Sequence, residues 1–556
     1  MSRRGNSVLS GVHRRLAALR GRTLAARLAK LTAGVDGPVV LLLDGNAHND
    51  LSTWVEAFGA ARLTVLAEHS PVPHEGVRCV VVAGRREIDQ ELALLGACRI
   101  VVDEIAADPD KQLARWARFG LHVDLGGWYV VRAATSPLAW QAKVATFGEE
   151  VEPRMRAFLI ESALHAVLAA DHLLLPKRRR HVLRVNDRTA DLLLPRRNPE
   201  LQITTLASRP AELVTSRLQV FSHGPNDVFL PELPFEAPRL TCQWYRGEVE
   251  ARAQMLTISG ATALPPSFRH AWAERPGNHG LADVGRRFAE LPESTGAPAL
   301  AGDYFDLNAA VPGHFGHVMT ESLGKLWAWD EARRAIPGLQ GLYRLPKGAE
   351  APGFEATLFE AFGVPSDDIH WVTSDVSIES YVSPTVPWHN GRPFHFHPAV
   401  VDVWQRLRAA LVIPGQATPE RIFVSRGNGE RPCRNQAEVE AWFAQRGFDV
   451  VFPERLSLPD QATLFANARV VAGFAGSALF NLLYAEHVDK VILLSHEQYS
   501  ARNEWLYAVS VADELHYFWS EPETKAAAGV RWRASFHSTW SFDFERFGAE
   551  LEQVVR

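Results

Sequence analysis

The sequence has 556 residues and a formal net charge of −5 at pH 7, so its overall charge does not favour binding to nucleic acid. Its length allows roughly three domains of ordinary size. No apolar run approaches the ~20 residues that a membrane span requires. The four cysteines, Cys79, Cys98, Cys242 and Cys433, lack metal-ligand or disulfide-framework spacing, as expected for a protein of the reducing cytoplasm.

The N-terminal segment, residues 1–37, is basic and amphipathic. Residues 1–34 contain eight Lys or Arg and no Asp or Glu, with leucines interspersed at Leu16, Leu19, Leu24, Leu28 and Leu31. The segment lacks the uninterrupted apolar centre and cleavage site of a secretory signal. A basic amphipathic helix here would rest on an anionic membrane surface. The alternative is a helix packed on the protein or a partly disordered tail.

Residues 38–135 predict a first α/β domain of Rossmann-like layout. Apolar runs separated by helical stretches predict strands at residues 39–43, 63–66, 79–82 and 99–102. A hairpin is then expected to turn at Gly126 and Gly127. The layout resembles a methyltransferase-like Rossmann domain, with Glu68 where such a fold holds a ribose. The loop at residues 44–50 lacks the glycine pattern that lets a nucleotide approach, so we expect an accessory domain without chemistry of its own.

A helical connector is expected at residues 136–180, where it ends in the basic run from Lys177 to Arg180. The next region, residues 181–400, predicts the first lobe of a larger α/β unit. Its early part is rich in strands and turns, with strands expected near residues 201–205, 218–221 and 254–258.

The stretch GHFGHVMTESLGKLW, which begins at Gly313, places a histidine and a glutamate on one face of a helix. His317 and Glu321 are four residues apart, so each can orient the other or exchange a proton with it. A histidine or carboxylate in a cleft is the usual general base. The alternative is a His–Glu pair that only ties the helix to its neighbour. The spacing leaves open which of the two would be the base.

Residues 401–520 predict a second lobe with a parallel sheet. From residue 421 to residue 486 the expected elements alternate as βαβαβα, an order that requires a parallel sheet with covered faces. Ligands of such sheets bind beyond the carboxyl ends of the strands. The loop after the first of these strands contains Arg426, Arg431 and Arg434 and ends at Asn435, where a helix begins. Guanidinium groups and the N–H groups of a helix start both suit phosphate oxygens.

A second feature of this lobe follows another expected strand. The turn GFAGS, residues 473–477, has small residues that let backbone amides approach an anion at the start of the next helix. With the basic loop, Gly476 and Ser477 therefore predict a diphosphate site. The alternative is a solvated basic loop beside an ordinary tight turn.

The order of motifs in the C-terminal half resembles glycosyltransferase family 61. The matching positions are Ser425-Arg426, Arg431, Asn435, Glu438, Gly447-Phe448, Pro453-Glu454, Leu456-Ser457, Asp460-Gln461, Leu464-Phe465, Gly473, Gly476-Ser477, Leu479 and Asn481. Earlier in the chain, the family pattern GHxxxE...LW is matched by Gly316, His317, Glu321, Leu326 and Trp327. The resemblance covers about residues 250–556.

The resemblance implies a GT-B fold, in which two Rossmann-like lobes face each other across a cleft, here preceded by the additional α/β domain. It implies an inverting transfer with His317 or Glu321 as the base or its orienter. The diphosphate of a nucleotide-sugar donor would be held by Arg426, Arg431 and Arg434, with Asn435, Gly476, Ser477 and Asn481 at helix starts. It also implies that residues 521–556 contain a helix that crosses back to the first lobe.

We therefore expect an inverting glycosyltransferase that needs neither a metal nor a cofactor, since no convincing Asp-x-Asp pair follows a strand. The expected acceptor is a surface or capsular-type glycan or glycolipid at the cytoplasmic face of the membrane, with peripheral contact through residues 1–34. Two alternatives stay open. One is a sugar-nucleotide epimerase of GT-B fold. The other is a non-catalytic protein that binds sugar nucleotides or glycans, which Ala475 and Ser495 favour because relatives have polar groups there.

Overall fold

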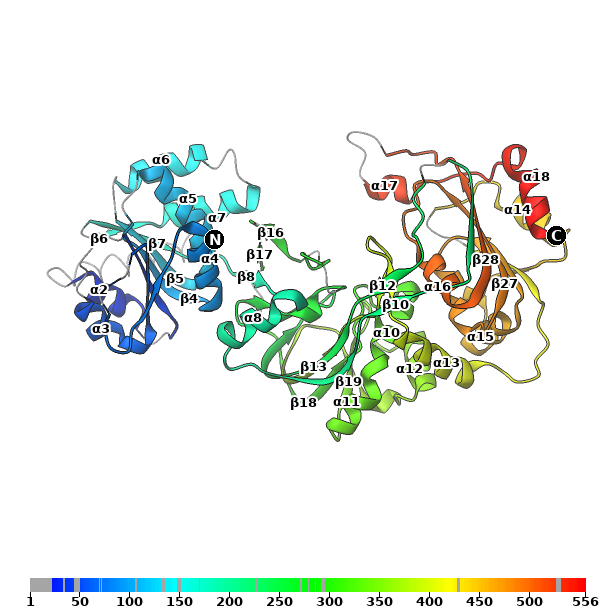
Figure 1. Cartoon of the computed structure of the whole chain (residues 1–556), viewed down its shortest axis with the longest axis horizontal. Coiled ribbons are helices and arrows are strands. Elements are labelled where there is room, and N and C mark those ends of the chain that lie inside the picture. Colours follow the sequence, from blue (N-terminus) through cyan, green and yellow to red (C-terminus); the bar gives the residue numbers. More distant parts are fainter. Residues whose placement is uncertain are drawn as a thin grey trace.

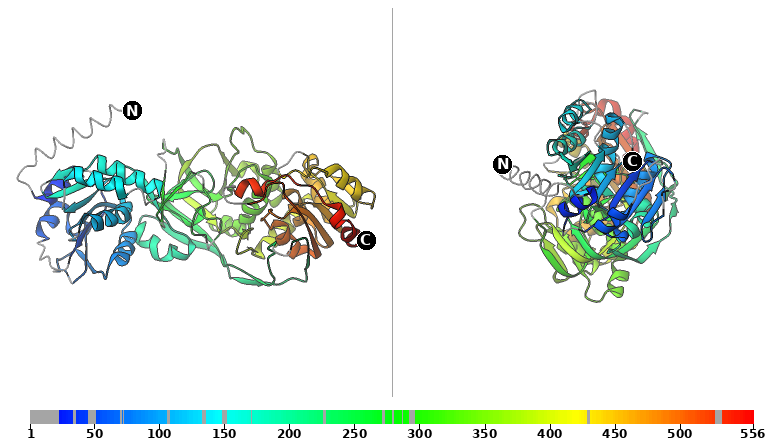
Figure 2. Two further views of the ribbon diagram at one scale, coloured as in Figure 1. Left: turned by 90° about the horizontal axis from the view of Figure 1, so that it is seen from above. Right: turned by 90° about the vertical axis from the view of Figure 1, so that its left-hand side faces the viewer.

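The computed structural model arranges the chain as three α/β parts in a row along its longest axis (Figures 1 and 2). The described residues are 23–33, 36–44, 51–69, 71, 73–105, 108–132, 136–147, 152–169, 171–225, 228–270, 273–278, 280–285, 287–291, 296–427, 431–526 and 532–556. Residues 1–22, which contain most of the basic segment, and most of the loop at 44–50 lie outside them.

The described end of the basic segment packs on the first part. Helix α2, Leu24–Leu31, buries Ala25 and Leu28 in a cluster with strand residues of that part. Leu24 and Leu31 are partly buried against the same cluster. This half of the segment therefore contributes to a core, and a membrane contact would have to come from residues 1–22.

The first part is a seven-stranded sheet of order β3-β2-β1-β4-β5-β7-β6. The strands are β1 (Val39–Leu43), β2 (Leu63–Ala67), β3 (Arg78–Val81), β4 (Cys98–Asp103), β5 (Val123–Arg132), β6 (Val167–Ala169) and β7 (His172–Pro176). The helices are α3 (Ser52–Phe58), α4 (Arg85–Leu94), α5 (Pro109–Phe119), α6 (Pro137–Phe147) and α7 (Pro153–Leu164). Strands β1 to β5 pair in parallel, and the all-apolar β1 is buried on both faces. The predicted α/β character of this region is confirmed.

Two details predicted for this part are wrong. Gly126 and Gly127 do not turn a hairpin, because β5 continues through them and pairs with β4 across a register shift. A Cβ at position 127 would lie 2.6 Å from the carbonyl oxygen of Arg99, so glycine permits this close approach of strands. The expected helical connector contains α6 and α7, but it ends in β6 and β7, which extend the sheet in antiparallel pairing. Their pairing partner β5 precedes both helices, so no local pattern indicates it.

The second part is built on an eleven-stranded mixed sheet of order β16-β17-β8-β15-β14-β13-β21-β18-β19-β20, with β9 paired to β13 beside this path. Its strands are β8 (His181–Arg184), β9 (Gln202–Arg209), β13 (Leu240–Ala251), β14 (Thr257–Ser259), β15 (Thr262–Ala263), β16 (Ala282–Val284), β17 (Phe288–Glu290), β18 (Ala299–Asp306), β19 (Gln340–Arg344), β20 (Ile369–Val372) and β21 (Val376–Pro384). Its helices are α8 (Asp187–Arg197), α9 (Phe315–His317), α10 (Leu323–Lys325), α11 (Trp329–Ala335) and α12 (Phe354–Phe362). Strands β18 to β21 are mutually parallel.

The third part is a six-stranded parallel sheet of order β11-β28-β27-β26-β24-β25. Its strands are β11 (Gln219–His223), β24 (Arg421–Val424), β25 (Asp449–Val451), β26 (Val470–Phe474), β27 (Val488–His496) and β28 (Ala512–Ser520). Its helices are α13 (Ala399–Leu411), α14 (Gln436–Ala444), α15 (Leu458–Asn467), a 3₁₀ helix (Ser477–Tyr484) and α16 (Asn503–Val511). The predicted parallel sheet is confirmed. Strand β11 joins it from residues that the expected boundaries place in the first lobe.

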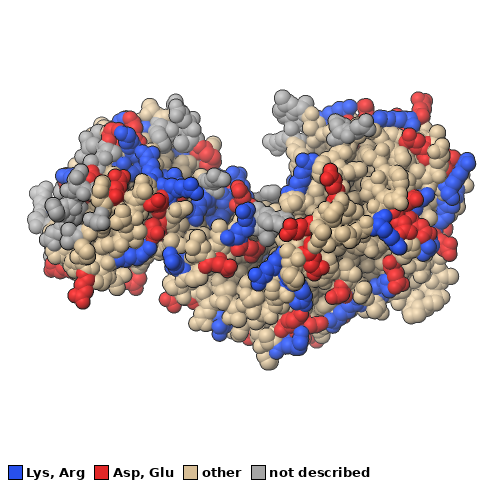
Figure 3. Space-filling view, viewed as in Figure 1, with Lys and Arg blue, Asp and Glu red and all other residues tan. Residues whose placement is uncertain are grey.

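Short antiparallel pairs complete the strands: β10 (Glu212–Val214) with β12 (Phe235–Ala237), and β22 (Trp388–His389) with β23 (His395–Phe396). The charged side chains on the face in Figure 3 are of both signs, and basic ones are denser on the first part. Within the ranges given above, no helix is both long and apolar enough to cross a membrane.

The expected return of residues 521–556 to the first lobe is wrong for the residues that the structure describes there. Helix α18 (Phe544–Val555) packs on the third sheet, and α17 (Trp532–Phe536) precedes it (Figure 1). Phe547 and Leu551 share a buried cluster with Phe423 of β24 and Ile492 of β27. Lys490 also donates a hydrogen bond to the carbonyl oxygen of Val554 at 2.7 Å. The apolar side of α18 therefore packs on the third sheet, whose strands precede it in the sequence.

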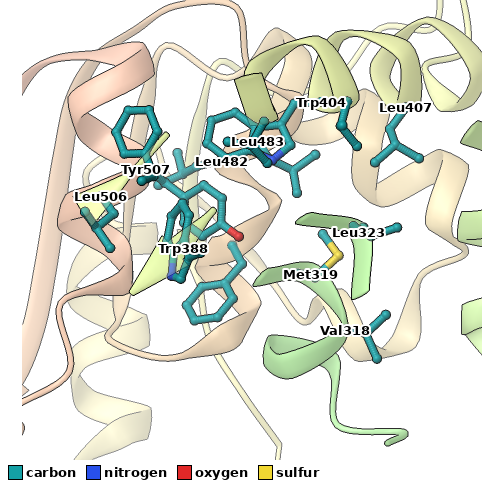
Figure 4. Packing of buried hydrophobic residues seen from close by; sticks show 14 of the residues in the cluster. Val318, Met319, Leu323, Trp388, Trp404, Leu407, Leu482, Leu483, Leu506 and Tyr507 are labelled. Atoms are coloured by element: carbon teal, nitrogen blue, oxygen red, sulfur yellow. The ribbon is translucent and has the colours of Figure 1, made fainter. Parts of the chain in front are cut away.

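One buried apolar cluster spans the second and third parts (Figure 4). It combines Leu323 of α10, in the second part, with Trp404, Leu482 and Tyr507 of the third part. The rings of Trp388 and Tyr507 lie 4.5 Å apart between centroids. This shared core fixes the two parts against each other, and it therefore fixes the walls of a cavity between them.

Replacing Leu551 with alanine tests the placement of α18. Leu551 is fully buried, so its truncation should lower the unfolding free energy of the third part by about 2–5 kcal/mol. Exposed Gln553 on the same helix is the control, and Gln553→Ala should change this free energy by less than about 0.5 kcal/mol. Hydrogen-exchange mass spectrometry of β24 and β27 measures the effect, with β1 and β4 as internal references. Exchange as slow in Leu551→Ala as in the wild type would contradict this packing.

Candidate active site

A cavity of about 890 Å³ lies between the second and third parts, within the size range of small-molecule sites. Its third-part wall contains Ser425, Arg426, Gly427, Arg431, Pro453, Glu454, Leu456, Ser457, Leu458, Pro459, Gln461, Phe474, Gly476, Ser477, Ala478 and Asn481. Its second-part wall contains His314, Phe315, Phe354 and Thr357. The cavity adjoins the carboxyl ends of β24 and β26, where ligands of parallel sheets bind. Of the seven predicted substrate-binding residues, the five that line it are Arg426, Arg431, Gly476, Ser477 and Asn481.

Two arginines meet at one glycine in this cavity. A Cβ at Gly476 would lie 3.5 Å from Nη1 of Arg426 and 3.5 Å from Nη2 of Arg431. Arg426 also donates a hydrogen bond to the carbonyl oxygen of Arg431 at 3.3 Å. Burial and the neighbouring Arg431 charge lower the pKa of Arg426 to about 10. Two adjacent guanidinium groups create a positive potential that favours an anion.

Arg431 is held by aromatic rings and by an unusual backbone conformation. Its guanidinium lies 4.7 Å from the ring centroid of Tyr499 and 5.3 Å from that of Phe536. Its φ angle is 60°, in the left-handed region that non-glycine residues rarely adopt. The indole N–H of Trp540 donates to its carbonyl oxygen at 3.2 Å, and the hydroxyl of Tyr499 donates to buried Glu504 at 2.9 Å. These contacts hold both the guanidinium and the backbone of Arg431 in place, and unfavourable backbone conformations held in this way are common at functional sites.

The glycine turn forms as predicted, but the helix that follows is a 3₁₀ helix. Gly473 allows β26 to approach β24, since a Cβ there would lie 2.6 Å from the carbonyl oxygen of Val424. Asn481 is fully buried and donates to Gln461 Oε1 at 3.0 Å, so it holds the turn to α15. Gly316 meets this turn from the second part, since its Cβ would lie 3.1 Å from the Cβ of Ser477.

His317 and Glu321 form the predicted pair. Nδ1 of His317 lies 2.9 Å from Oε1 of Glu321. His317 ends α9, and Glu321 lies in the π-helical turn that follows (Val318–Ser322), of a kind often found at functional sites. The side chain of Glu321 is only 2% exposed, whereas that of His317 is 26% exposed. Glu321 also accepts from the N–H of Ala310 at 2.7 Å and pairs with Arg269 at 2.7 Å.

The surroundings keep Glu321 ionised. Burial alone would raise its pKa, but Arg269 and the His317 hydrogen bond outweigh burial and lower the pKa to about 2. An ionised carboxylate only accepts hydrogen bonds, so Nδ1 of His317 must supply the proton between them. In the neutral imidazole this leaves Nε2 as the proton acceptor.

His317 and Glu321 are not among the residues that line the cavity, although His314 and Phe315 just before them are. Two of the predicted substrate-binding residues also lie outside the lining. Arg434 is exposed and forms a bidentate pair with Glu523, with Nη2 to Oε2 at 2.8 Å. Asn435 begins α14 as predicted, but its side chain bonds Phe542, accepting from the N–H and donating to the carbonyl at 2.9 Å each. Both side chains therefore hold the C-terminal segment in place, which the sequence spacing did not indicate.

The family comparison covers both walls of the cavity. Residues 315–492 match the family model described as Glycosyltransferase 61. This region belongs to glycosyltransferase family 61. The match begins beside His317 and continues through both arginines and the glycine turn, so one family accounts for the segments that the structure brings together. The match assigns residues 315–492 to a family of glycosyltransferases.

Other comparisons add little to the glycosyltransferase assignment. No curated protein matches the chain. Among solved structures, the chain is similar to the MycE methyltransferase from the mycinamycin biosynthetic pathway in complex with Mg and SAH, with 16% identity, a TM-score of 0.22, and 31% of this chain and 49% of that chain covered. A complex of the same enzyme with Mg, SAH and mycinamycin VI gives 17% identity, a TM-score of 0.21, and coverage of 30% and 48%. The chain spans about half the length of these matched structures.

Several residues of the candidate site were not predicted. His314 and Phe315 lie just before the predicted pair, and Phe354 comes from α12. Arg269 reaches Glu321 from a distant loop. Glu454 accepts a hydrogen bond from the N–H of Gly427 at 2.7 Å. Only Glu454 had a signal in the sequence, as part of the Pro-Glu motif, whereas the others depend on how the second part folds.

In the described residues, one group of side chains has the spacing of a metal site, namely His487, Asp489 and Asp513. These residues lie at the amino ends of β27 and β28, opposite the cavity. Arg469 pairs with Asp489 at 2.6 Å, and Arg217 pairs with Asp513 at 2.6 Å. Because guanidinium groups already neutralise both carboxylates, this cluster is an ion-pair network.

His496, buried at the end of β27, reports on the arginine pair. Burial, then Arg431 and Arg426, lower its pKa to about 4. A bound diphosphate would offset the two guanidinium charges, so we expect the pKa of His496 to rise when UDP or another nucleoside diphosphate binds. NMR titration of the imidazole with and without nucleotide measures this shift, and His487 at the far end of the strand is the control. A nucleotide that binds but leaves the His496 titration unchanged would contradict this location.

Proposed function

We propose that the chain is an inverting glycosyltransferase that moves a sugar from a nucleotide-diphosphate donor to a hydroxyl of a surface or capsular-type glycan. The observation that carries this proposal is one cavity in which an arginine pair and a glycine turn face the helix of His317. An inverting displacement needs a group that stabilises the departing diphosphate and a base for the acceptor hydroxyl. The arginine pair offers the first, and His317, two residues after the lining residue Phe315, offers the second.

The arginine pair takes the donor diphosphate in this proposal. Arg426 and Arg431 converge on Gly476, where the backbone presents no side chain to a ligand. Guanidinium groups bind phosphate oxygens through paired hydrogen bonds. Their two charges supply the stabilisation that a divalent metal gives in other transferases, so we propose a metal-independent reaction without a further cofactor.

His317 is the base in this proposal, and Glu321 is its orienter. Glu321 is buried and ionised, and its carboxylate already contacts His317, the N–H of Ala310 and Arg269. It is therefore a poor proton acceptor with little access to substrate. It fixes the His317 tautomer with Nε2 as the acceptor. Burial thus divides the two roles: the more exposed imidazole ring of His317 meets the acceptor hydroxyl, and the buried carboxylate of Glu321 holds the ring.

The second and third sheets form the two lobes of a GT-B arrangement in this proposal. Support comes from the parallel strands of each sheet and from a cavity lined by both parts. The donor occupies the third part, and the acceptor approaches along the second. The four cysteines are free thiols, which suits a cytoplasmic enzyme at the inner face of the membrane, with peripheral contact left to residues 1–22.

Removing Arg431 tests the donor site. Arg431→Ala should weaken binding of the preferred nucleoside diphosphate about 30-fold or more, since a buried charge-assisted contact contributes roughly 2–5 kcal/mol. Thermal-shift titrations with UDP, GDP, CDP and TDP, with and without Mg²⁺, measure this binding because a ligand of the native state raises its stability. Arg434→Ala is the matched control, since that exposed side chain lies outside the cavity. Equal affinity in wild type and Arg431→Ala would refute the phosphate assignment.

Replacing the His–Glu pair tests the catalytic roles. His317→Ala should lower turnover by about 10²–10⁴-fold while nucleotide affinity stays unchanged, because the base acts only on the acceptor. Glu321→Gln should also lower turnover, since the amide fixes the imidazole less well. Release of nucleoside diphosphate from the donor sugar, with water as the acceptor, measures turnover. His165→Ala in the first part is the control, and near-normal turnover in His317→Ala would remove His317 as the base.

A further inference from the structure

A second cavity lies beside helix α8, on the second part. Its volume is about 550 Å³, and its walls come from α8, β9 and β13. A narrow continuation shares several of these residues and reaches Phe268 and Lys325. Phe268 adjoins Arg269, and Lys325 is one helical turn after Glu321. The continuation therefore reaches residues that lie close in sequence to Arg269 and Glu321, the ion pair that holds the proposed base.

The polar lining of this cavity mixes hydrogen-bond donors with acceptors. Polar side chains that line it include Asp187, Arg188, Asp191, Arg239, Thr241 and Gln243. Every saccharide hydroxyl can both donate and accept a hydrogen bond. The carboxylates of the lining accept, the guanidinium groups donate, and the hydroxyl and amide groups do both, so the lining offers partners for each role. Pro238, Pro265 and Tyr245 add apolar surface suited to the C–H faces of a sugar ring. A lining with both charges present does not favour a strongly anionic or cationic ligand.

Asp187 is the residue whose position most needs a ligand. It lies in the first turn of α8, is half-buried, and lines both the cavity and its continuation. Across the described part of the chain, its carboxylate has no hydrogen bond or ion pair. Burial and nearby Asp191 raise its pKa to about 6. A half-buried carboxylate without a partner is unfavourable, and hydroxyl groups of a ligand would relieve this.

We propose that this cavity is a saccharide-binding subsite for the acceptor glycan, separate from the place where its reacting hydroxyl meets His317. Asp187 accepts hydrogen bonds from sugar hydroxyls, and Arg188 and Gln243 donate to sugar oxygens. The inference rests on the proposed glycosyltransferase function. The subsite lies on the same lobe as the base, so one extended glycan can contact both places at once. The second contact increases the affinity for that glycan. The enzyme would therefore prefer an oligosaccharide acceptor to a single sugar.

Binding of the fluorescently labelled full-length protein to a printed array of defined oligosaccharides tests this subsite. The wild type should bind a subset of the glycans. Asp187→Asn, which keeps the shape of the side chain, and Arg188→Ala should each weaken that binding about tenfold or more, as expected for a lost charge-assisted hydrogen bond. Glu200→Gln, at an exposed carboxylate outside the cavity, is the matched control and should bind as the wild type does. Nucleoside-diphosphate thermal shifts should be equal in all four proteins.

No glycan binding by the wild type, or equal binding by the wild type and both variants, would overturn the subsite. If Asp187→Asn also loses its response to nucleotide, its fold is damaged and Arg188→Ala decides, since that side chain is exposed. Failure of the proposed function has a different signature, in which the wild type does not respond to any nucleoside diphosphate. The array does not use a donor, so the two failures are distinguishable.

Discussion

The candidate site depends on the close approach of the helix start at Gly316 to the turn after Gly476. A Cβ at position 316 would lie 3.0 Å from a ring carbon of Phe480 and 3.1 Å from the Cβ of Ser477, so a larger residue there would crowd both side chains. His317 follows Gly316 directly, and Ser477 follows Gly476. This contact therefore sets the separation between the His–Glu pair and the arginine pair.

The arginine side of the site carries features that oppose stability. Two guanidinium groups lie together against Gly476, and Arg431 adopts a left-handed backbone conformation, which is unfavourable by about 1–3 kcal/mol. The rings of Tyr499 and Phe536 and the N–H of Trp540 hold it there. Such an arrangement is poorly suited to an empty site and well suited to one that binds an anion. The fold keeps it because the large core shared by the second and third parts supplies the stability.

The first part has a structural connection to the second cavity. Arg197 at the end of α8 donates to the carbonyl oxygen of Ala93 in the first part at 3.2 Å. The same guanidinium donates to the carbonyl oxygen of Ala261 at 3.0 Å, and its Nε donates to the hydroxyl of Thr262 at 2.8 Å. Arg197 is buried, so these hydrogen bonds are shielded from water. The first part therefore braces the helix that borders the second cavity.

The sequence by itself determined the parallel sheet of the third part and five of the residues that line its cavity, because strand periodicity, glycine turns and basic loops are local patterns. It also placed His317 and Glu321 on one face. Only the tertiary structure decided that Arg434 and Asn435 hold the C-terminal segment, that Arg269 keeps Glu321 ionised, and that β11 and α18 belong to the third part. Those contacts join residues far apart in the chain, and their energies come from burial and pairing that exist only after folding.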